Sequence, residues 1–259
     1  MNKTKIMVIN SRVLLRAESR QALNQLENAE FFDCAPGETG NNVITQIAAN
    51  SPDIVLLDIG FPQLKGLEFA DRIARVYPSV AMITLSTNPD EDGDEIFEVI
   101  KCGAVAYLSG KQPCISVLID TIKQVCEGKL PISEVVINSP SLAHRIQRQF
   151  QDMTLSGSKE HNVIIPLTFA EEKILELIVL KTPEKQIAAF LNLTEDTVNN
   201  RVSIILKKMA ANTRAYYLFN KMRDDLISVR IAKYGNLLLF NSTPASCQFQ
   251  PSPLGLSHT

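Results

Sequence analysis

The feature that most constrains this chain is the stretch 193–209, in which apolar and polar residues separate onto two faces of a helix. Thr194 is placed to cap the helix N-terminus, and the two acids after it suit the positive end of the helix dipole. The apolar residues recur at offsets of 4, 7, 8 and 11, which places them on one face: Val198, Val202, Ile205, Leu206 and Met209. This spacing predicts an amphipathic helix that packs through that face.

The opposite face of the predicted helix is rich in hydrogen-bonding groups and cations and has no carboxylate. It carries Asn200, Ser203 and Lys207, flanked by Asn199 and Lys208. A helix in the major groove of DNA needs groups of these kinds to meet base edges and phosphates.

The preceding residues predict two more helices. Residues 182–191 read as a short helix with Thr182 as N-cap and Pro183 at the first helical position, followed by a turn at Asn192 and Leu193. Upstream, Thr168 and Glu171 form a capping box that opens a helix through Leu180. A short helix, a tight turn and a capped amphipathic helix together predict a helix-turn-helix.

Motifs along this region resemble those of the LuxR-type (NarL/FixJ) DNA-binding domain, from Leu167 to about Leu218. They are Leu-Thr-x-x-Glu-Glu, Lys-Gln-Ile-Ala, Leu-Thr-Glu-Asp-Thr-Val, Ile-Leu-Lys-Lys-Met and Asn-Thr-Arg-Ala. Asn199, Arg201 and Ala210 stand where that family usually has Lys, His and Gly, so the target sequence is not transferable from other members. The alternative is a helical hairpin that packs on something other than DNA.

The resemblance implies a homodimer that binds a two-fold-related site on double-stranded DNA, with one recognition helix per half-site. We expect Asn199, Asn200 and Ser203 to contact base edges, and Ile204 to meet a thymine methyl. The residues expected at phosphates are Lys185, Thr197, Arg201, Lys207 and Lys208.

Residues 1–130 alternate strand and helix signals and predict an α/β domain with a doubly wound, five-stranded parallel sheet. The expected strands are Lys5–Asn10, Phe31–Ala35, Asp53–Leu57, Val80–Leu85 and Ala104–Leu108. The expected helices are Val13–Leu26, Val43–Ala49, Gly66–Val76, Glu95–Lys101 and Ile115–Glu127. Ligands of such sheets bind beyond the carboxyl ends of the strands.

Residues at those strand ends resemble a response-regulator receiver domain, over about Lys5 to Gly128. Asp58, with Gly66 eight residues later, matches the surroundings of the family's phosphoacceptor. Ser86 stands where receivers keep a Ser or Thr that bonds the phosphoryl group, and Tyr107 matches their switch aromatic.

The predicted phosphorylation chemistry is incomplete. Aspartyl phosphorylation needs Mg²⁺, and receivers supply two acids for it just after the first strand, where this chain has Asn10 and Ser11. Lys111 falls one position later than the family's lysine. Two interpretations of Asp58 follow. In the first, which the missing charges favour, Asp58 is a relic and the receiver serves to dimerise or to sense a ligand. In the second, Asp58 accepts a phosphoryl group from a histidine kinase, with Mg²⁺ as the only cofactor.

The remaining segments divide the chain further. Residues 131–165 are expected to be a linker containing a helix at Leu142–Met153, which either packs on a partner subunit or acts as a spacer. The helix-turn-helix domain is expected over 166–233, with a last helix at Arg214–Lys233 that either dimerises or packs internally. The tail, 234–259, is expected to be disordered because it is rich in Ser, Pro and Gln from Ser242 onward.

Composition agrees with a soluble two-domain protein of 259 residues, with 45% hydrophobic and 21% charged residues. Residues 1–130 hold 12 Lys and Arg against 17 Asp and Glu, a net of -5, whereas residues 166–222 hold 8 against 6, a net of +2. The five cysteines form no CxxC pair, and no apolar run reaches the length of a membrane span, about 18 residues. We therefore expect a cytoplasmic protein with reduced cysteines.

These patterns together favour a DNA-binding transcription regulator with an atypical receiver. One alternative is a conventional regulator activated by phosphorylation of Asp58. Another is a protein-interaction antagonist that binds another regulator and never DNA. An enzyme is not expected, because the sequence holds no complete catalytic constellation.

Overall fold

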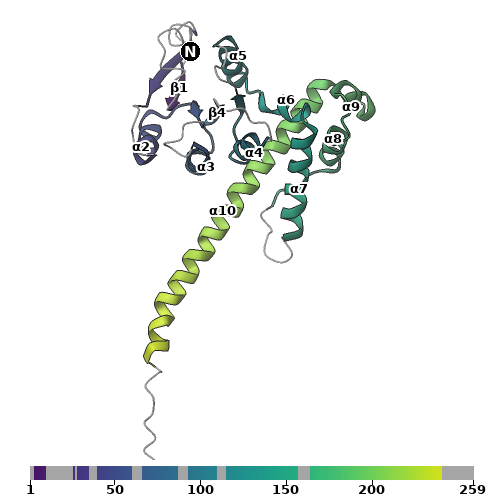
Figure 1. The fold of residues 1–259 in the computed structure, drawn as a ribbon. Helices are drawn as coiled ribbons and strands as arrows, with labels where there is room; N and C mark the ends of the chain where they lie inside the picture. The colour runs from purple at the N-terminus through teal and green to yellow at the C-terminus, as the bar shows by residue number, and fades with distance from the viewer. Residues whose placement is uncertain are drawn as a thin grey trace, which may run out of the picture. The chain divides into compact units, whose positions relative to one another are not determined.

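A computed structural model describes residues 3–9, 26, 28–34, 40–59, 66–86, 93–109, 115–156 and 164–240. Its N-terminal part is a five-stranded parallel sheet with the strand order β2-β1-β3-β4-β5 (Figure 1). The strands are β1 (Thr4–Ile9), β2 (Ala29–Asp33), β3 (Ile54–Asp58), β4 (Ala81–Ser86) and β5 (Ala106–Ser109). The predicted doubly wound sheet is thereby confirmed, with strand boundaries moved by one to two residues.

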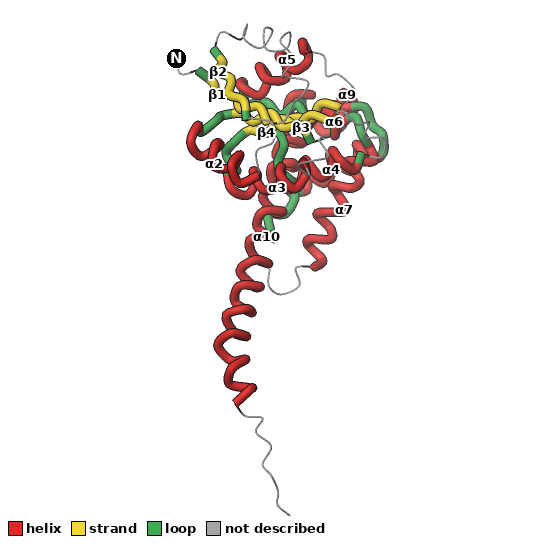
Figure 2. Tube along the Cα trace, turned by 60° about the vertical axis from the view of Figure 1, so that its left-hand side comes forward, coloured by secondary structure: helices red, strands yellow, loops and turns green. Residues whose placement is uncertain are grey.

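Helices cover both faces of the sheet because successive residues of each strand point to opposite sides. The helices are α2 (Gly40–Asn50), α3 (Gly66–Val76), α4 (Asp94–Lys101) and α5 (Ile115–Cys126). One face, with Met7, Val55 and Met82, packs in a core with α2, α3 and α4. The other, with Ile6 and Leu56, packs in a second core with α5 (Figure 2). The helix predicted at Val13–Leu26 lies almost wholly outside the described residues.

The glycine in the Asp58–Gly66 pattern is needed for packing. A Cβ built on Gly66 would lie 2.4 Å from the Cα of Ile59, the residue that follows β3. A side chain at this position would therefore push the start of α3 away from the strand that ends in Asp58. The glycine lets the helix approach the carboxyl end of the strand.

The described residues 131–156 of the segment predicted as a linker are largely helical and contribute to the core. It forms α6 (Ile132–Ile137), which the sequence interpretation missed, and α7 (Pro140–Ser156), which contains the predicted helix. Buried side chains from both helices belong to the core that also includes the sheet and the C-terminal helices: Ile132, Val136, Ile137, Leu142, Ala143, Ile146 and Phe150. Since α7 packs extensively on α8, it is more than a spacer.

The C-terminal helices are α8 (Phe169–Val179), α9 (Glu184–Leu191) and α10 (Glu195–Phe240). The prediction of a separate last helix at Arg214–Lys233 is wrong, because the recognition helix continues through it as one helix of 46 residues. The physical reason lies in the sequence, which has no Gly or Pro between residues 195 and 234 and has Ala210 instead of the family's Gly. Residues 234–240 of the predicted tail are helical, and 241–259 lie outside the described residues.

The chain divides into two compact units, Met1–Tyr216 and Tyr217–Thr259. The receiver-like sheet, α6 to α9 and the first part of α10 thus belong to one unit. In the part of the chain that the structure describes, no helix is long and apolar enough to cross a membrane.

Candidate nucleic-acid interface and receiver pocket

The predicted cap of the recognition helix is confirmed. The amide of Thr197 donates to the Thr194 hydroxyl oxygen at 3.2 Å, and the two hydroxyls lie 2.8 Å apart. Helix α10 accordingly begins at Glu195. The hydroxyl of Thr197, predicted at a phosphate, already takes part in this cap.

The turn before the recognition helix also agrees with the sequence. Asn192 ends α9 in the left-handed conformation, with φ of 54°. An asparagine tolerates this conformation better than most residues do. The start of α9 is one residue later than predicted, because Pro183 rather than Thr182 occupies the N-cap position.

The apolar face of the recognition helix is buried as predicted: Val198, Val202, Ile205, Leu206 and Met209 are all at most 4% exposed. On the opposite face Asn200, Arg201 and Lys207 are exposed, and Ile204 is 39% exposed. Lys185 on α9 is exposed as well, whereas Asn199 and Ser203 are half-buried. The polar face is therefore a surface rather than part of the core.

This polar face borders a cleft of about 540 Å³. One wall consists of recognition-helix residues: Asp196, Asn199, Asn200, Ser203, Ile204 and Lys207. The other consists of Gln124 of α5, the segment 128–131 and Glu134 of α6. At this cleft the buried hydroxyl of Ser133 lies in hydrogen-bond contact with the side-chain oxygen of Asn199. A group predicted to read bases is therefore engaged by α6 in this structure.

Several carboxylates lie near the N-terminal end of α10, where it faces α6. Burial raises the pKa of the Glu184 carboxyl, and the nearby charges of Glu195, Glu134 and Asp196 raise it further. Mutual repulsion among these acids opposes close approach of α6 to the start of the recognition helix.

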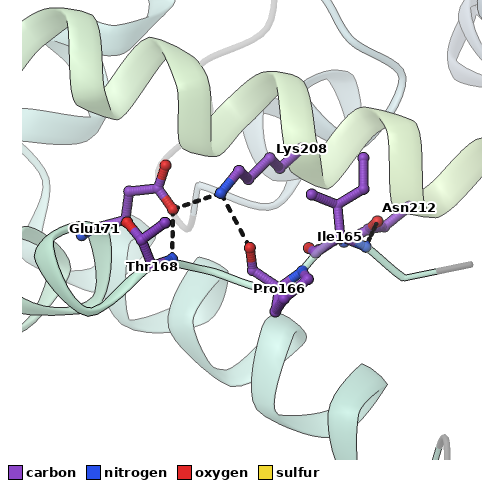
Figure 3. A network of polar contacts seen from close by, with 6 residues as sticks. All are labelled: Ile165, Pro166, Thr168, Glu171, Lys208 and Asn212. Atoms are coloured by element: carbon purple, nitrogen blue, oxygen red, sulfur yellow. Dashed lines mark hydrogen bonds and ion pairs between the residues drawn. The ribbon is translucent and has the colours of Figure 1, made fainter. Parts of the chain in front are cut away.

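A buried ion pair ties the recognition helix to α8 (Figure 3). The Lys208 ammonium lies 2.7 Å from Oε2 of Glu171, which is 2% exposed, and donates to the Pro166 carbonyl at 3.0 Å. Oε2 of Glu171 also accepts from the Thr168 amide at 2.7 Å, and the Glu171 amide donates to the Thr168 hydroxyl, which completes the predicted capping box. Lys208, predicted at a phosphate, is thus held inside its own domain.

Asn212 performs a related task that the sequence interpretation missed. Its side-chain amide donates to the Ile165 carbonyl at 3.0 Å, and its side-chain oxygen accepts from the Ile165 amide at 2.8 Å (Figure 3). The side chain of Asn212 is 1% exposed. A buried asparagine on an otherwise apolar helix face was the available signal, because such an amide needs partners.

Hydrogen bonds decide the charge state of Glu171. Burial alone would raise the pKa of its carboxyl, but hydrogen bonds from Lys208 and Thr168, with the charge of Lys208, lower it on balance. The carboxylate therefore stays ionised and adds stability at neutral pH.

The receiver pocket is only partly described. Asp58 and Ser86 end adjacent parallel strands, β3 and β4, and both are buried. Tyr107 of β5 donates its hydroxyl to Oε1 of Glu95 at 2.8 Å. Asn10, Ser11 and Lys111 lie outside the described residues. The structure therefore brings Asp58 and Ser86 to one edge of the sheet, as predicted, and leaves the other pocket residues as predictions.

The residues present do not fit the usual magnesium site of receivers. The positions of the two acids after β1 hold Asn10 and Ser11, so both charges that would accompany Asp58 are missing. Among the described residues no group of three or more His, Cys, Asp or Glu side chains is placed to hold a metal.

Comparison with known proteins agrees with this architecture. Residues 6–123 match the response regulator receiver domain, and residues 166–217 match the bacterial regulatory proteins of the luxR family. The transcriptional regulatory protein DegU of Brevibacillus brevis is 30% identical over 234 residues, which cover 88% of this chain and 97% of that protein. The chain belongs to the NarL/FixJ-type response regulators.

Other relatives are more distant. The nitrate/nitrite response regulator NarL of Escherichia coli K12 is 27% identical over 211 residues, 81% of this chain and 90% of that protein. A structure of the Salmonella typhimurium response regulator RcsB is 17% identical and covers 84% of this chain and 98% of that one, with a TM-score of 0.43. By its family the present chain is a DNA-binding transcription factor of the LuxR type, and the relatives named here are regulators rather than enzymes.

Replacing Lys208 by Met should lower the free energy of unfolding by about 3 kcal/mol, because it leaves the buried Glu171 carboxylate without its cation. The difference from the wild type should shrink as the pH falls through the lowered pKa of Glu171, since a neutral carboxyl no longer needs the ammonium. Urea denaturation at several pH values measures both effects. The control is Lys173→Met, which breaks the exposed Lys173–Glu176 pair and should cost less than about 1 kcal/mol. Equal losses for the two variants would contradict this account of the buried pair.

Proposed function

We propose that this protein binds double-stranded DNA as a homodimer through the polar face of α10, and that its control does not depend on conventional aspartyl phosphorylation. The observation that carries the proposal is the exposed polar face of a capped helix whose opposite face is buried; beyond Asp196 in the first turn, this face carries no carboxylate as far as Lys207. Asn200, Arg201 and Lys207 supply amide and cationic groups at the solvent side of this face. Such groups bind base edges and phosphates in a major groove.

Three residues are accessible enough to contact phosphates. Lys207 and Arg201 on α10 are exposed, as is Lys185 on α9, and long cationic side chains at these sites suit phosphate oxygens. Lys208 contributes by fixing the helix through Glu171 rather than by contacting DNA. The base-reading group in this proposal is Asn199, Asn200 and Ser203, with Ile204 at a thymine methyl.

Binding DNA requires the cleft beside the recognition helix to open. Asn199 contacts Ser133, and residues 128–131 face the polar surface of α10 across the cleft. A DNA duplex cannot share the space that α6 occupies. The form described here is therefore a closed one, and DNA binding selects a form in which α6 has moved from Asn199.

The proposal of phosphate-independent control rests on charge. Asp58 keeps its place at the end of β3, but Asn10 and Ser11 stand in place of the acids that would hold Mg²⁺. Without the cation, two anions would have to meet at the carboxylate during phosphoryl transfer, and this is unfavourable. A histidine kinase or another regulatory protein would then act through contact with the receiver.

The homodimer is supported by apolar side chains on α10 beyond the matched LuxR-family region. Leu218 and Met222 are 55% and 65% exposed and lie one helical turn apart. The sequence continues with Leu226 and Val229, so the apolar spacing of 218, 222, 226 and 229 extends along the helix. Helices with such a stripe commonly pair with a second copy.

Replacing Lys207 by Ala should weaken binding to every DNA sequence and reduce the slope of log affinity against log salt by about 1. Replacing Asn200 by Ala should instead change base preference, with a cost of about 1–3 kcal/mol at one base position. Selection of bound sequences from a random pool, followed by affinity titrations at several salt concentrations, separates the two effects. An equal loss of affinity on all sequences for Asn200→Ala would contradict base recognition by Asn200. If the wild type bound no genomic fragment, the alternative of an antagonist that binds another regulator would be favoured.

Acetyl phosphate with Mg²⁺ should leave Asp58 unmodified and DNA affinity unchanged. Mass spectrometry of the peptide containing Asp58 and a DNA titration before and after incubation measure this. Asp58→Asn serves as the control and should bind DNA like the wild type. A mass increase of one phosphoryl group on Asp58, together with higher DNA affinity, would establish the conventional regulator.

Replacing Met222 by Glu should raise the dimer dissociation constant by roughly tenfold or more, because it places a charge in an apolar interface. Sedimentation velocity over a concentration series measures the change. Val76→Glu is the control, since Val76 is a half-exposed apolar residue on α3 of the receiver. A dimer unaffected by Met222→Glu would place the interface elsewhere.

A further inference from the structure

A cavity lies between α7 and α8, which pack side by side (Figure 1). Its volume is about 510 Å³, within the range of about 300–1,000 Å³ that is usual for pockets that hold small organic molecules. It shares no described lining residue with the cleft beside the recognition helix. The cavity is therefore a separate site, which neither the receiver pocket nor the proposed DNA contact uses.

Two helical faces and the segment that leads into α8 form the walls of this cavity. The four residues from α7 follow the spacing of one helical face, i, i+3, i+4 and i+7, and are Gln147, Phe150, Gln151 and Thr154. Glu172 and Glu176 are about one turn apart and lie on the same side of α8. Pro166 and Leu167, which precede α8, complete the described lining. The packing of α7 on α8 thus creates the cavity.

The buried part of the lining is apolar. Phe150 is 5% exposed and belongs to the core, and Leu167 packs against the same core. Two polar groups of the lining are already bonded within the protein. The Thr154 hydroxyl donates to the Phe150 carbonyl at 2.8 Å, and the Pro166 carbonyl accepts from the Lys208 ammonium at 3.0 Å (Figure 3). A ligand therefore meets aliphatic and aromatic surface here, which favours an apolar body.

The charged side chains of the lining are both carboxylates. Glu172 is exposed and forms no ion pair with another described residue, and Glu176 pairs with Lys173 at 2.8 Å. Among the described residues that line the cavity there is no Lys, Arg or His. Lys208 bonds a backbone carbonyl of the lining, but its charge is neutralised by the buried Glu171. The described lining therefore attracts cations.

We propose that the cavity between α7 and α8 binds an organic cation, a molecule with an ammonium or quaternary ammonium group on an apolar chain or ring. The apolar part lies on Phe150 and Leu167, and the cationic head lies at Glu172 and Glu176. The side-chain oxygens of the two glutamines from α7 accept hydrogen bonds from an ammonium that carries protons. This inference goes beyond the proposed DNA binding and does not rest on it.

Other classes of small molecule fit the lining less well. A carboxylate or phosphate ligand would bring its negative charge to Glu172 and Glu176, and the described lining offers it no free cation. A neutral apolar ligand gains the contact with Phe150 but nothing from the carboxylates. A cation contacts α7 through its apolar body and α8 through its head, so its binding stabilises the folded protein as its concentration rises.

Isothermal titration calorimetry of the full chain tests the proposal with three probes of one chain length: octyltrimethylammonium, octan-1-ol and octanoate, each at concentrations where it is monomeric. The cation should bind roughly tenfold more tightly than octan-1-ol, because the attraction of the carboxylates adds to the apolar contact. Octanoate should bind more weakly than either. The unfolding temperature, followed by circular dichroism, should rise with the concentration of the cation and rise least with octanoate.

Charge variants test the role of the carboxylates. The double variant Glu172→Gln with Glu176→Gln should lower the affinity for octyltrimethylammonium to about that for octan-1-ol and leave the affinity for octan-1-ol unchanged. The matched control is Glu98→Gln on α4. Glu98 pairs with Lys101 at the i,i+3 spacing, as Glu176 pairs with Lys173, and the two glutamate side chains are similarly exposed, 46% and 49%. This control should bind all three probes like the wild type.

A filling variant tests the place of binding without removing a charge. Gln151→Trp puts an indole ring beside the apolar surface of the cavity and should abolish binding of both octyltrimethylammonium and octan-1-ol. The control is Gln186→Trp, since Gln186 is also an exposed glutamine on a helix, α9, but does not line the cavity. It should leave binding unchanged. Circular dichroism confirms that each variant is folded.

The outcomes separate this inference from the DNA-binding proposal. The inference is overturned by equal affinities for the cation and octanoate, or by the absence of saturable binding of the cation. Wild-type affinity in both the double glutamate variant and Gln151→Trp shows that the cation binds elsewhere, and also overturns it. Cation binding at this site by a protein that binds no DNA supports the inference and overturns the proposed function, whereas DNA binding without cation binding overturns the inference alone.

Discussion

The burial of one face of α10 is the constraint on which the rest of the molecule depends. Val198, Val202 and Ile205 are completely buried, and this determines which residues of the same helix remain at the surface. Rotating the helix by one residue would bring polar side chains into the core, at a cost of several kcal/mol for each unpaired group. The core therefore specifies the reading face, although no core residue contacts DNA in the proposed complex.

Local patterns predicted most of the elements because their causes are local. Helix α3 has the predicted bounds, and the cap at Thr194 and the capping box at Thr168 depend on residues only three positions apart. The parallel arrangement of the sheet followed from alternating strands and helices, since parallel strands need crossover connections. The continuity of α10 was also present in the sequence, as Ala210 in place of a helix-ending glycine, but the family pattern favoured a break there.

Contacts between distant residues were beyond the reach of local patterns. Lys208 looked like a phosphate ligand because it follows Lys207 on a cationic face, and only the fold brings it to Glu171, 37 residues earlier. Asn199 looked like a base-reading residue, and the fold places Ser133, 66 residues earlier, against its side chain. In both cases the chemical type of the side chain was evident from the sequence, but its partner in the fold is set by tertiary packing.

In the proposed function, α6 and DNA compete for the same side chain, Asn199 of α10. In the proposed complex the Asn199 amide contacts DNA, whereas in this structure it contacts Ser133, so under that proposal the apparent affinity for DNA falls with the fraction of molecules that are closed. This competition can regulate DNA binding only if a signal changes the fraction of molecules in which α6 contacts Asn199. In the proposed function this signal is not phosphorylation of Asp58, because Asn10 and Ser11 stand where the acids that hold Mg²⁺ would be. The ion pair of Arg145 with Asp94 joins α4 of the receiver to α7, which also packs on α8.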